Sequence, residues 1–199
     1  MIYRKKSREI KPLVRRGAYY IPGLNRIFIS INKNASTSCI QAIKAAGHGR
    51  ERFHFADLDD LRYKDVEIST MWRDPLRRME STYRMYRAIR KGKLLGLGFS
   101  DWVIRLCQDG TPDPHIYPQW HHVTHEGQWL PHRVFKWDFD EFARYFGIKK
   151  VKEINKSIDK VPDYYIDLEW SPSAKSLFKR IYKRDFEVWT GENSGHKRV

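Results

Sequence analysis

A strand, a polar turn and a helix follow one another directly between residues 26 and 46. Residues 26–31 read RIFISI, an apolar run that predicts a central strand covered on both faces. From Ser36 to Ala46 apolar residues recur at helical spacing, and Gly47 marks the expected end of the helix. A chain that leaves a buried strand and enters a helix within four residues is typical of an α/β fold.

The turn itself carries the chemistry of an anion site. The N-terminus of a helix presents unpaired N–H groups and a partial positive charge. Lys33 adds a full charge there, and further donors follow from Asn34, Ala35, Ser36, Thr37 and Ser38. This predicts a cradle for a multiply charged phosphate group. The alternative is an ordinary helix start with a solvated lysine. The ATP-type pattern GxxxxGK[ST] is absent.

A second strand-to-helix transition repeats this pattern. Residues 66–72 (VEISTMW) predict a strand, and Asp74 and Pro75 are typical of an N-cap and a first helical position. Arg73 ends the strand, and Ser81 follows about two turns into the helix. Ligands of α/β sheets bind beyond the carboxyl ends of the strands, so two such ends can hold two phosphates of one nucleotide. The alternative is that Arg73 pairs with Asp74 or another carboxylate.

Strands alternate with helices along the rest of the chain. A short helix capped by Ser100 is expected, then a long loop over 109–120, a strand over 134–137, a helix over 139–146 and a last helix from Pro172. The pattern predicts one domain over residues 1–199, with residues 1–22 as a basic N-terminal arm. Its expected fold is a three-layer α/β/α, P-loop-like fold with a mainly parallel central sheet.

The charge balance indicates an anionic partner. The chain has 199 residues and a formal net charge of +14, which favours a phosphorylated cofactor, an acidic polymer, a nucleic acid or a membrane surface. We find no signal peptide and no apolar run long enough to cross a membrane. The two cysteines, Cys39 and Cys107, lie in apolar periodic segments and are interpreted as free thiols. A cytoplasmic protein is therefore expected.

The segments FISINKNASTS and MWRDPLRRMESTYRMY together resemble the sulfotransferases that use 3′-phosphoadenosine 5′-phosphosulfate (PAPS), most closely their carbohydrate branch. The patterns are roughly hxxxPKxAxTS and RDPxxRxxSxY; Asn32 departs from the first, where proline is usual. Three further landmarks follow in order, resembling DPHxxPQ, hNxS and IYxxDF, at residues 113–119, 154–157 and 181–186.

The resemblance implies a 5′-phosphosulfate loop at residues 33–38 and a 3′-phosphate site at Arg73 and Ser81, with the product PAP (3′-phosphoadenosine 5′-phosphate) and no metal. It also implies that residues 155–157 close over the cofactor. The catalytic histidine of related enzymes occurs between the two phosphate motifs, which points to His54 as the base. His115 is the second candidate and otherwise a substrate contact. The alternative for His54 is a partly buried histidine between two aromatic residues.

Sulfuryl transfer needs a base for the acceptor proton and a cation for the leaving phosphate oxygen, and Lys33 suits the second task.

His121, His122 and His125 form the pattern HHxxH, which offers a zinc site as an alternative, but no second cluster of ligands supports it. Arg52, Arg62 and Lys64 flank His54 and are candidates to bind an anionic glycan. Four tryptophans could stack on sugar rings or belong to the core: Trp72, Trp102, Trp120 and Trp129.

The acceptor stays open among a uronic-acid polysaccharide, a neutral glycan, a lipid-linked sugar and a small alcohol. The lack of a secretory signal favours a bacterial or viral cytosolic enzyme over a Golgi-resident one. Two other functions remain as alternatives: a basic nucleic-acid-binding protein, although no nucleic-acid module is recognised, and a P-loop kinase of small molecules, which lacks the expected glycines.

Overall fold

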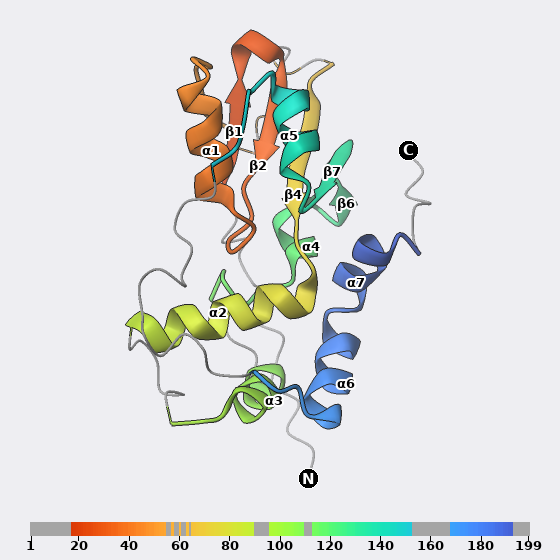
Figure 1. Cartoon of the computed structure of the whole chain (residues 1–199). Helices are drawn as coiled ribbons and strands as arrows, with labels where there is room; N and C mark the ends of the chain where they lie inside the picture. The colour runs from red at the N-terminus through yellow and green to blue at the C-terminus, as the bar shows by residue number, and fades with distance from the viewer. Residues whose placement is uncertain are drawn as a thin grey trace.

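A computed structural model describes residues 17–54, 57, 60, 63, 65–89, 96–109, 113–152 and 168–192 (Figure 1). Its strands are β1 (Ala18–Ile21), β2 (Arg26–Ile29), β3 (Glu51–Arg52), β4 (Glu67–Trp72), β5 (Thr124–His125), β6 (Gln128–Trp129) and β7 (Arg133–Lys136). Its helices are the 3₁₀ turn η1 (Pro22–Leu24), α1 (Ser36–Ala45), α2 (Pro75–Ile89), α3 (Phe99–Asp109), α4 (Gln119–His122), α5 (Phe139–Phe146), α6 (Pro172–Ile181) and α7 (Lys183–Thr190).

The central sheet has the strand order β3-β1-β2-β4-β7. β2 pairs with β4, and β4 with β7, in parallel. β1 is antiparallel to both of its neighbours, so β3 points the same way as β2, β4 and β7. The expected α/β architecture is thereby confirmed, with β1 as the antiparallel member of the sheet. The carboxyl ends of the other four strands meet at one edge, which we call the carboxyl edge.

The segment that was expected to be a basic arm contributes a strand. β1 occupies residues 18–21 and pairs with β2 over its whole length, from Ala18 opposite Ile29 to Ile21 opposite Arg26. Its two end residues are buried, and their burial is the physical reason that this short run joins the sheet. The arm prediction is therefore wrong for residues 18–21, and residues 1–16 lie outside the described part of the chain.

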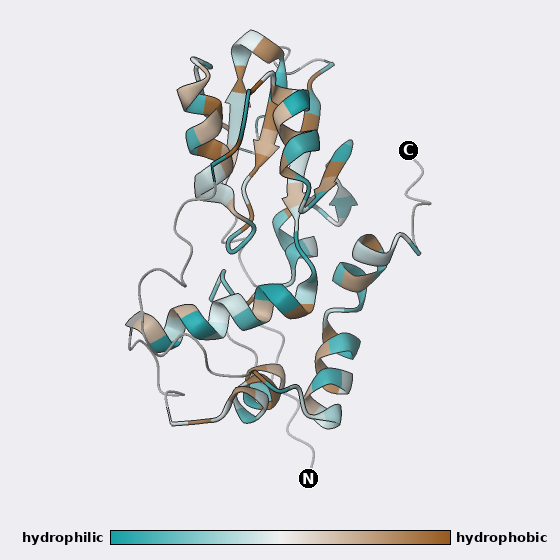
Figure 2. Ribbon diagram, viewed as in Figure 1, coloured by the Kyte–Doolittle hydropathy of each residue, from teal (hydrophilic) through white to brown (hydrophobic). Residues whose placement is uncertain are grey.

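The two faces of the sheet are covered differently. Phe28, Met71 and Phe135 pack with α1 and α5 in one apolar cluster. Ile27, Ile29, Ile68 and Trp72 point to the opposite face, as the two-residue period of a strand requires. On that face the described partners come from the segment after β3, from the β5–β6 hairpin and from α7, and not from a regular helical layer. Figure 2 shows β2 in the brown of apolar residues next to helices of mixed colour.

A separate helical unit lies beyond the carboxyl edge (Figure 1). Tyr83 of α2, Trp102 of α3 and Phe178 of α6 belong to one buried cluster there. α2 starts at Pro75 and α6 at Pro172, as expected, whereas α3 starts at Phe99, so Ser100 lies inside this helix and is not its cap. α7 was not predicted as a separate helix, because the chain bends at Tyr182 within one continuous apolar pattern.

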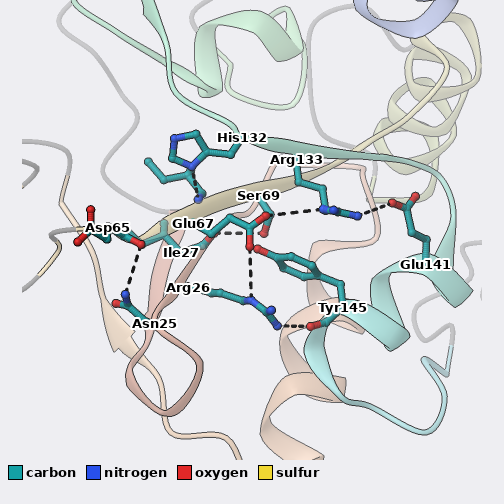
Figure 3. Close-up of polar contacts among 11 residues, drawn as sticks. Asn25, Arg26, Ile27, Asp65, Glu67, Ser69, His132, Arg133, Glu141 and Tyr145 are labelled. Carbon is teal, nitrogen blue, oxygen red and sulfur yellow. Dashed lines mark hydrogen bonds and ion pairs between the residues drawn. The ribbon is translucent and has the colours of Figure 1, made fainter. Parts of the chain in front are cut away.

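An ionic network joins the strands at the opposite, amino-terminal edge (Figure 3). The Glu67 carboxylate lies 3.8 Å from Arg26 and 3.7 Å from Arg133, and Arg133 also contacts Glu141 at 3.0 Å. The Arg26 guanidinium carbon lies 3.9 Å from the centre of the Tyr145 ring. The network links β2, β4, β7 and α5 at the edge away from the Lys33 turn, so it supports the sheet without occupying the carboxyl edge.

Candidate functional site

The turn between β2 and α1 has an unusual backbone. Lys33 and Ala35 both adopt the left-handed conformation, with φ of 67° and 54°. A residue with a Cβ is disfavoured there by about 1–2 kcal/mol. Such strain is found mainly where the surrounding structure imposes it, often at functional sites. The Ile31 carbonyl accepts the Asn34 N–H at 3.1 Å and also the Ser36 hydroxyl, which holds the turn closed.

The buried side chain of Asn34 stabilises this turn. Its side chain is completely buried, and Nδ2 donates to the Met71 carbonyl at 2.8 Å and to Oε1 of Gln119. Because its backbone N–H and its side-chain donors are all used within the protein, Asn34 supports the turn and has no donor left for a ligand. Its Oδ1 is buried with no hydrogen-bond partner.

The first turn of α1 is the second part of the predicted anion site. Ala35 is the N-cap, and no side chain caps the helix. Cys39 donates the first i→i−4 bond of the helix, to the Ala35 carbonyl, so the N–H groups of Ser36 and Thr37 lie ahead of the helical hydrogen-bond series. Thr37 is exposed, Ser38 is 2% exposed, and the Ser36 hydroxyl turns inward. Of the predicted hydroxyl donors, Thr37 is thus the one that faces solvent.

Arg73 lies directly beside the Lys33 turn. Its Nη1 donates to the Lys33 carbonyl at 3.1 Å, and its guanidinium carbon lies 4.4 Å from the centre of the Trp137 ring. Trp137 follows β7 and has a φ of 57°. The structure therefore brings the two predicted cationic strand ends together. Asp74 caps α2 as predicted, since its Oδ1 accepts from the N–H groups of Leu76 at 2.8 Å and Arg77 at 3.1 Å.

The electrostatic surroundings of Lys33 are those of a cation held without a counter-ion. Partial burial, followed by the positive charges of Arg73 and Arg78, lowers the pKa of Lys33 to about 8. Within the described residues no carboxylate forms an ion pair with its ammonium group. At neutral pH the group is still mainly charged, so an arriving phosphate would replace both lost hydration and missing counter-charge.

Arg78 is a third cation at the turn, and its role could not be predicted from the sequence pattern. It is 2% exposed, and its Nε donates to the Asn32 carbonyl at 3.0 Å. Its Nη2 is buried without a hydrogen-bond partner. Asp185, 1% exposed, is the nearby negative charge, and burial raises its pKa to about 6. Arg78 belongs to the RDPxxR pattern, but only the fold shows that it reaches the Lys33 turn.

α2 carries Ser81, and the edge strand β3 leads to His54. Ser81 is on α2 and 8% exposed, and at 1.5 Å per residue it lies about 9 Å along the axis from Pro75. His54 and Arg52 are exposed, at the end of the edge strand β3. β3 is two strands away from β2 in the sheet and points the same way, so His54 leaves the sheet at the carboxyl edge, roughly 10 Å to the side of the β2 end.

His115 and His122 both have partners within the fold. His115 Nδ1 lies 2.9 Å from Oδ1 of Asp113, whose Oδ2 accepts the Tyr86 hydroxyl. His122 Nε2 contacts the Pro114 carbonyl at 3.1 Å, and burial lowers the pKa of His122 to about 3. Across the described ranges no three His, Cys, Asp or Glu side chains are grouped as a metal site would require.

The tryptophans that were considered for sugar stacking are mainly core residues. Trp72, Trp102 and Trp120 are at most 8% exposed, and Trp129 packs on Trp120 with ring centres 4.9 Å apart. Several predictions lie outside the described residues: Arg62, Lys64 and the segment 155–157 that was expected to close over the cofactor.

Gln119 and Trp137 are site residues that were not predicted from the sequence. Gln119 stood in the quoted DPHxxPQ landmark without a role, and Trp137 is the last residue of the strand predicted over 134–137, which was the available signal. In the described part of the chain, no helix has the length and apolar character needed to cross a membrane. Comparisons with protein-family models, with curated proteins and with solved structures returned no match.

Proposed function

We propose that the protein is a PAPS-dependent sulfotransferase that moves a sulfuryl group to a hydroxyl of a carbohydrate-type acceptor. The observation that carries the proposal is the pairing of two cationic strand ends, in which Arg73 donates to the carbonyl of Lys33 at 3.1 Å. An adenosine bisphosphate needs positive charge at both of its phosphates. The β2–turn–α1 unit beside parallel β4 also supports a P-loop-like interpretation of the fold.

The donor groups of the site fit this ligand chemically. The Lys33 ammonium and the open N-terminus of α1 suit the 5′-phosphosulfate end. The Arg73 guanidinium is planar and suited to a phosphate monoester, and its central carbon lies over the Trp137 ring, 4.4 Å from the ring centre. Ser81 lies on α2, about two turns after its start, and in this proposal its hydroxyl adds to the 3′-phosphate contact from that helix.

Bound PAPS would supply the sulfuryl group: a bond forms between its sulfur and the acceptor oxygen, and its bond to the 5′-phosphate oxygen breaks. Lys33 stabilises the negative charge that gathers on the leaving phosphate. His54 takes the proton of the acceptor hydroxyl, for which its exposed position at the carboxyl edge is suitable. Arg52 precedes it on β3 and would contact an anionic acceptor.

A thermal-shift comparison tests the ligand class. A ligand that binds the folded state raises its stability by mass action, so PAP should raise the melting temperature and ATP with magnesium should not. Stabilisation by ATP with magnesium alone would favour a kinase. Binding to DNA with a steep salt dependence, and no response to PAP, would favour a nucleic-acid-binding protein.

Calorimetry with PAP tests the residue roles. Lys33→Ala and Arg73→Ala should each weaken PAP binding by about tenfold or more, since each removes a charge-assisted contact. Lys44→Ala on α1 and Arg87→Ala on α2 are exposed controls that should bind as the wild type does. His54→Ala should bind PAP normally and lose sulfuryl transfer. Normal transfer by His54→Ala would exclude this residue as the base.

A further inference from the structure

At the carboxyl edge, β4 loses its two hydrogen-bonded neighbours at different residues. β2 pairs with β4 as far as Thr70, and β7 pairs with it as far as Trp72. Beyond these points the main chain of β4 still needs hydrogen-bond partners, because buried N–H and C=O groups are costly to leave unpaired. Two side-chain amides supply them. Asn34 donates to the Met71 carbonyl at 2.8 Å.

Gln119 takes the place of a neighbouring strand at Arg73. Its Oε1 accepts the Arg73 N–H at 3.1 Å, and its Nε2 donates to the Arg73 carbonyl at 2.9 Å. One side-chain amide thus pairs with both main-chain groups of one residue, as a strand residue would. The same Oε1 accepts from Nδ2 of Asn34. Gln119 therefore joins the end of β4 to the Lys33 turn.

Gln119 is itself held in place from the other side. It is fully buried, and its backbone N–H donates to Oδ2 of Asp185 at 2.7 Å, while the N–H of Trp120 donates to Oδ1 at 2.9 Å. Asp185 lies on α7, and its carbonyl accepts the indole N–H of Trp72 at 3.2 Å. The amide is consequently fixed at both its backbone and its side chain.

We propose that Gln119 is a positioning residue that sets the distance between the Lys33 and Arg73 cations. Asn34 follows Lys33 in the chain, and Gln119 contacts both Asn34 and the Arg73 main chain, so it fixes the two cationic residues through their backbones. Under the proposed function, on which this inference rests, that distance corresponds to the separation of the 3′- and 5′-phosphates. Gln119 would thereby determine the preference for a bisphosphate over a monophosphate nucleotide.

The decisive measurement is the ratio of two affinities, for PAP and for adenosine 5′-monophosphate (AMP), by calorimetry. Gln119→Met keeps the length of the side chain and removes its three hydrogen bonds. It should weaken PAP binding by about tenfold or more, because Arg73 is no longer held opposite Lys33, and AMP binding by no more than about threefold. Gln119→Asn, which is too short to reach both main-chain groups of Arg73, should lower the ratio in the same direction.

Thr70→Val is the matched control. The Thr70 hydroxyl is also buried and also joins β4 to β2, by a 2.8 Å bond to the Ile29 carbonyl. This variant should lose stability while keeping the PAP-to-AMP ratio. A ratio that is unchanged in the folded Gln119 variants, or that falls equally in Thr70→Val, would overturn the inference.

A second readout needs no nucleotide. If Gln119→Met releases Arg73, the repulsion on Lys33 weakens, and the pKa of Lys33 should rise above about 8 but stay below 10.5, because burial, the largest cause of the lowering, and Arg78 remain. NMR titration of the isotope-labelled lysine amine measures this, and Thr70→Val should leave it unchanged. Failure of the wild type to bind PAP would count against the proposed function alone. An unchanged Lys33 pKa in Gln119→Met would count against the positioning role.

Discussion

Replacement of Lys33 by methionine should stabilise the ligand-free protein while weakening its binding of PAP. The pKa of Lys33 falls from 10.5 to about 8 because the ammonium is partly buried beside Arg73 and Arg78. One pKa unit corresponds to about 1.4 kcal/mol, so the charged group destabilises the fold by about 3 kcal/mol at pH 7. Methionine has a similar length and removes this charge.

The free energy of unfolding should depend on pH, because Lys33 has different pKa values in the folded and unfolded states. Below pH 8 Lys33 is charged in both the folded and the unfolded state, and the penalty is present in full. As the pH rises through 8 the folded state releases the proton while the unfolded state keeps it, so the free energy of unfolding rises until about pH 10.5. Relative to the wild type, Lys33→Met should therefore show its largest advantage below pH 8 and lose it by pH 10.5.

Urea unfolding at several values between pH 6 and 10.5 measures this difference, with Lys44→Met on the exposed side of α1 as the control. A surface change of that kind alters stability by no more than about 0.5 kcal/mol. At pH 7 the expected gain of Lys33→Met corresponds to a rise in melting temperature of at least about 6 °C. The reasoning is refuted if Lys33→Met is no more stable than Lys44→Met and shows the pH slope of the wild type.

Three further predictions concern the surroundings of the site. Trp137→Leu removes the ring 4.4 Å from the Arg73 guanidinium and should weaken PAP binding about threefold to tenfold by calorimetry; unchanged affinity would contradict the stacking role. Burial raises the pKa of Asp185 to about 6, so the free energy of unfolding of the wild type should fall as the pH rises from about 4 to 6. Asp185→Asn should lack this part of the pH slope in urea titrations. Gly17→Ala places a Cβ against the Ser30 carbonyl just before the turn and should lower the melting temperature, whereas Gly49→Ala, with open space around it, should not.

Local sequence patterns were sufficient for much of the fold. The apolar run at 26–31 and the helical spacing from Ser36 gave β2 and α1, and Asp74 with Pro75 gave the start of α2. These signals are local, because strand alternation, helical spacing and capping each act within a few residues. The same patterns placed Lys33 and Arg73 at two strand ends, and parallel pairing of β2 with β4 brought those ends together.

Other features depend on contacts that no local pattern contains. β1 is a strand because it can pair with β2, and it was wrongly predicted to be part of a basic arm. Gln119 lies 46 residues from Arg73 and 85 from Asn34 in the sequence, and Asp185 is 66 residues from Gln119. A buried amide or carboxylate is recognised only by the partners that satisfy it.

The sequence by itself thus determined that charged and hydroxyl residues follow the ends of two strands, because these positions follow from periodicity and helix capping. Only the tertiary structure decided how far apart the two cations lie, and that Arg78, Asp185, Gln119 and Trp137 surround them. The reason is that hydrogen bonding and desolvation act between groups adjacent in space, whatever their separation along the chain.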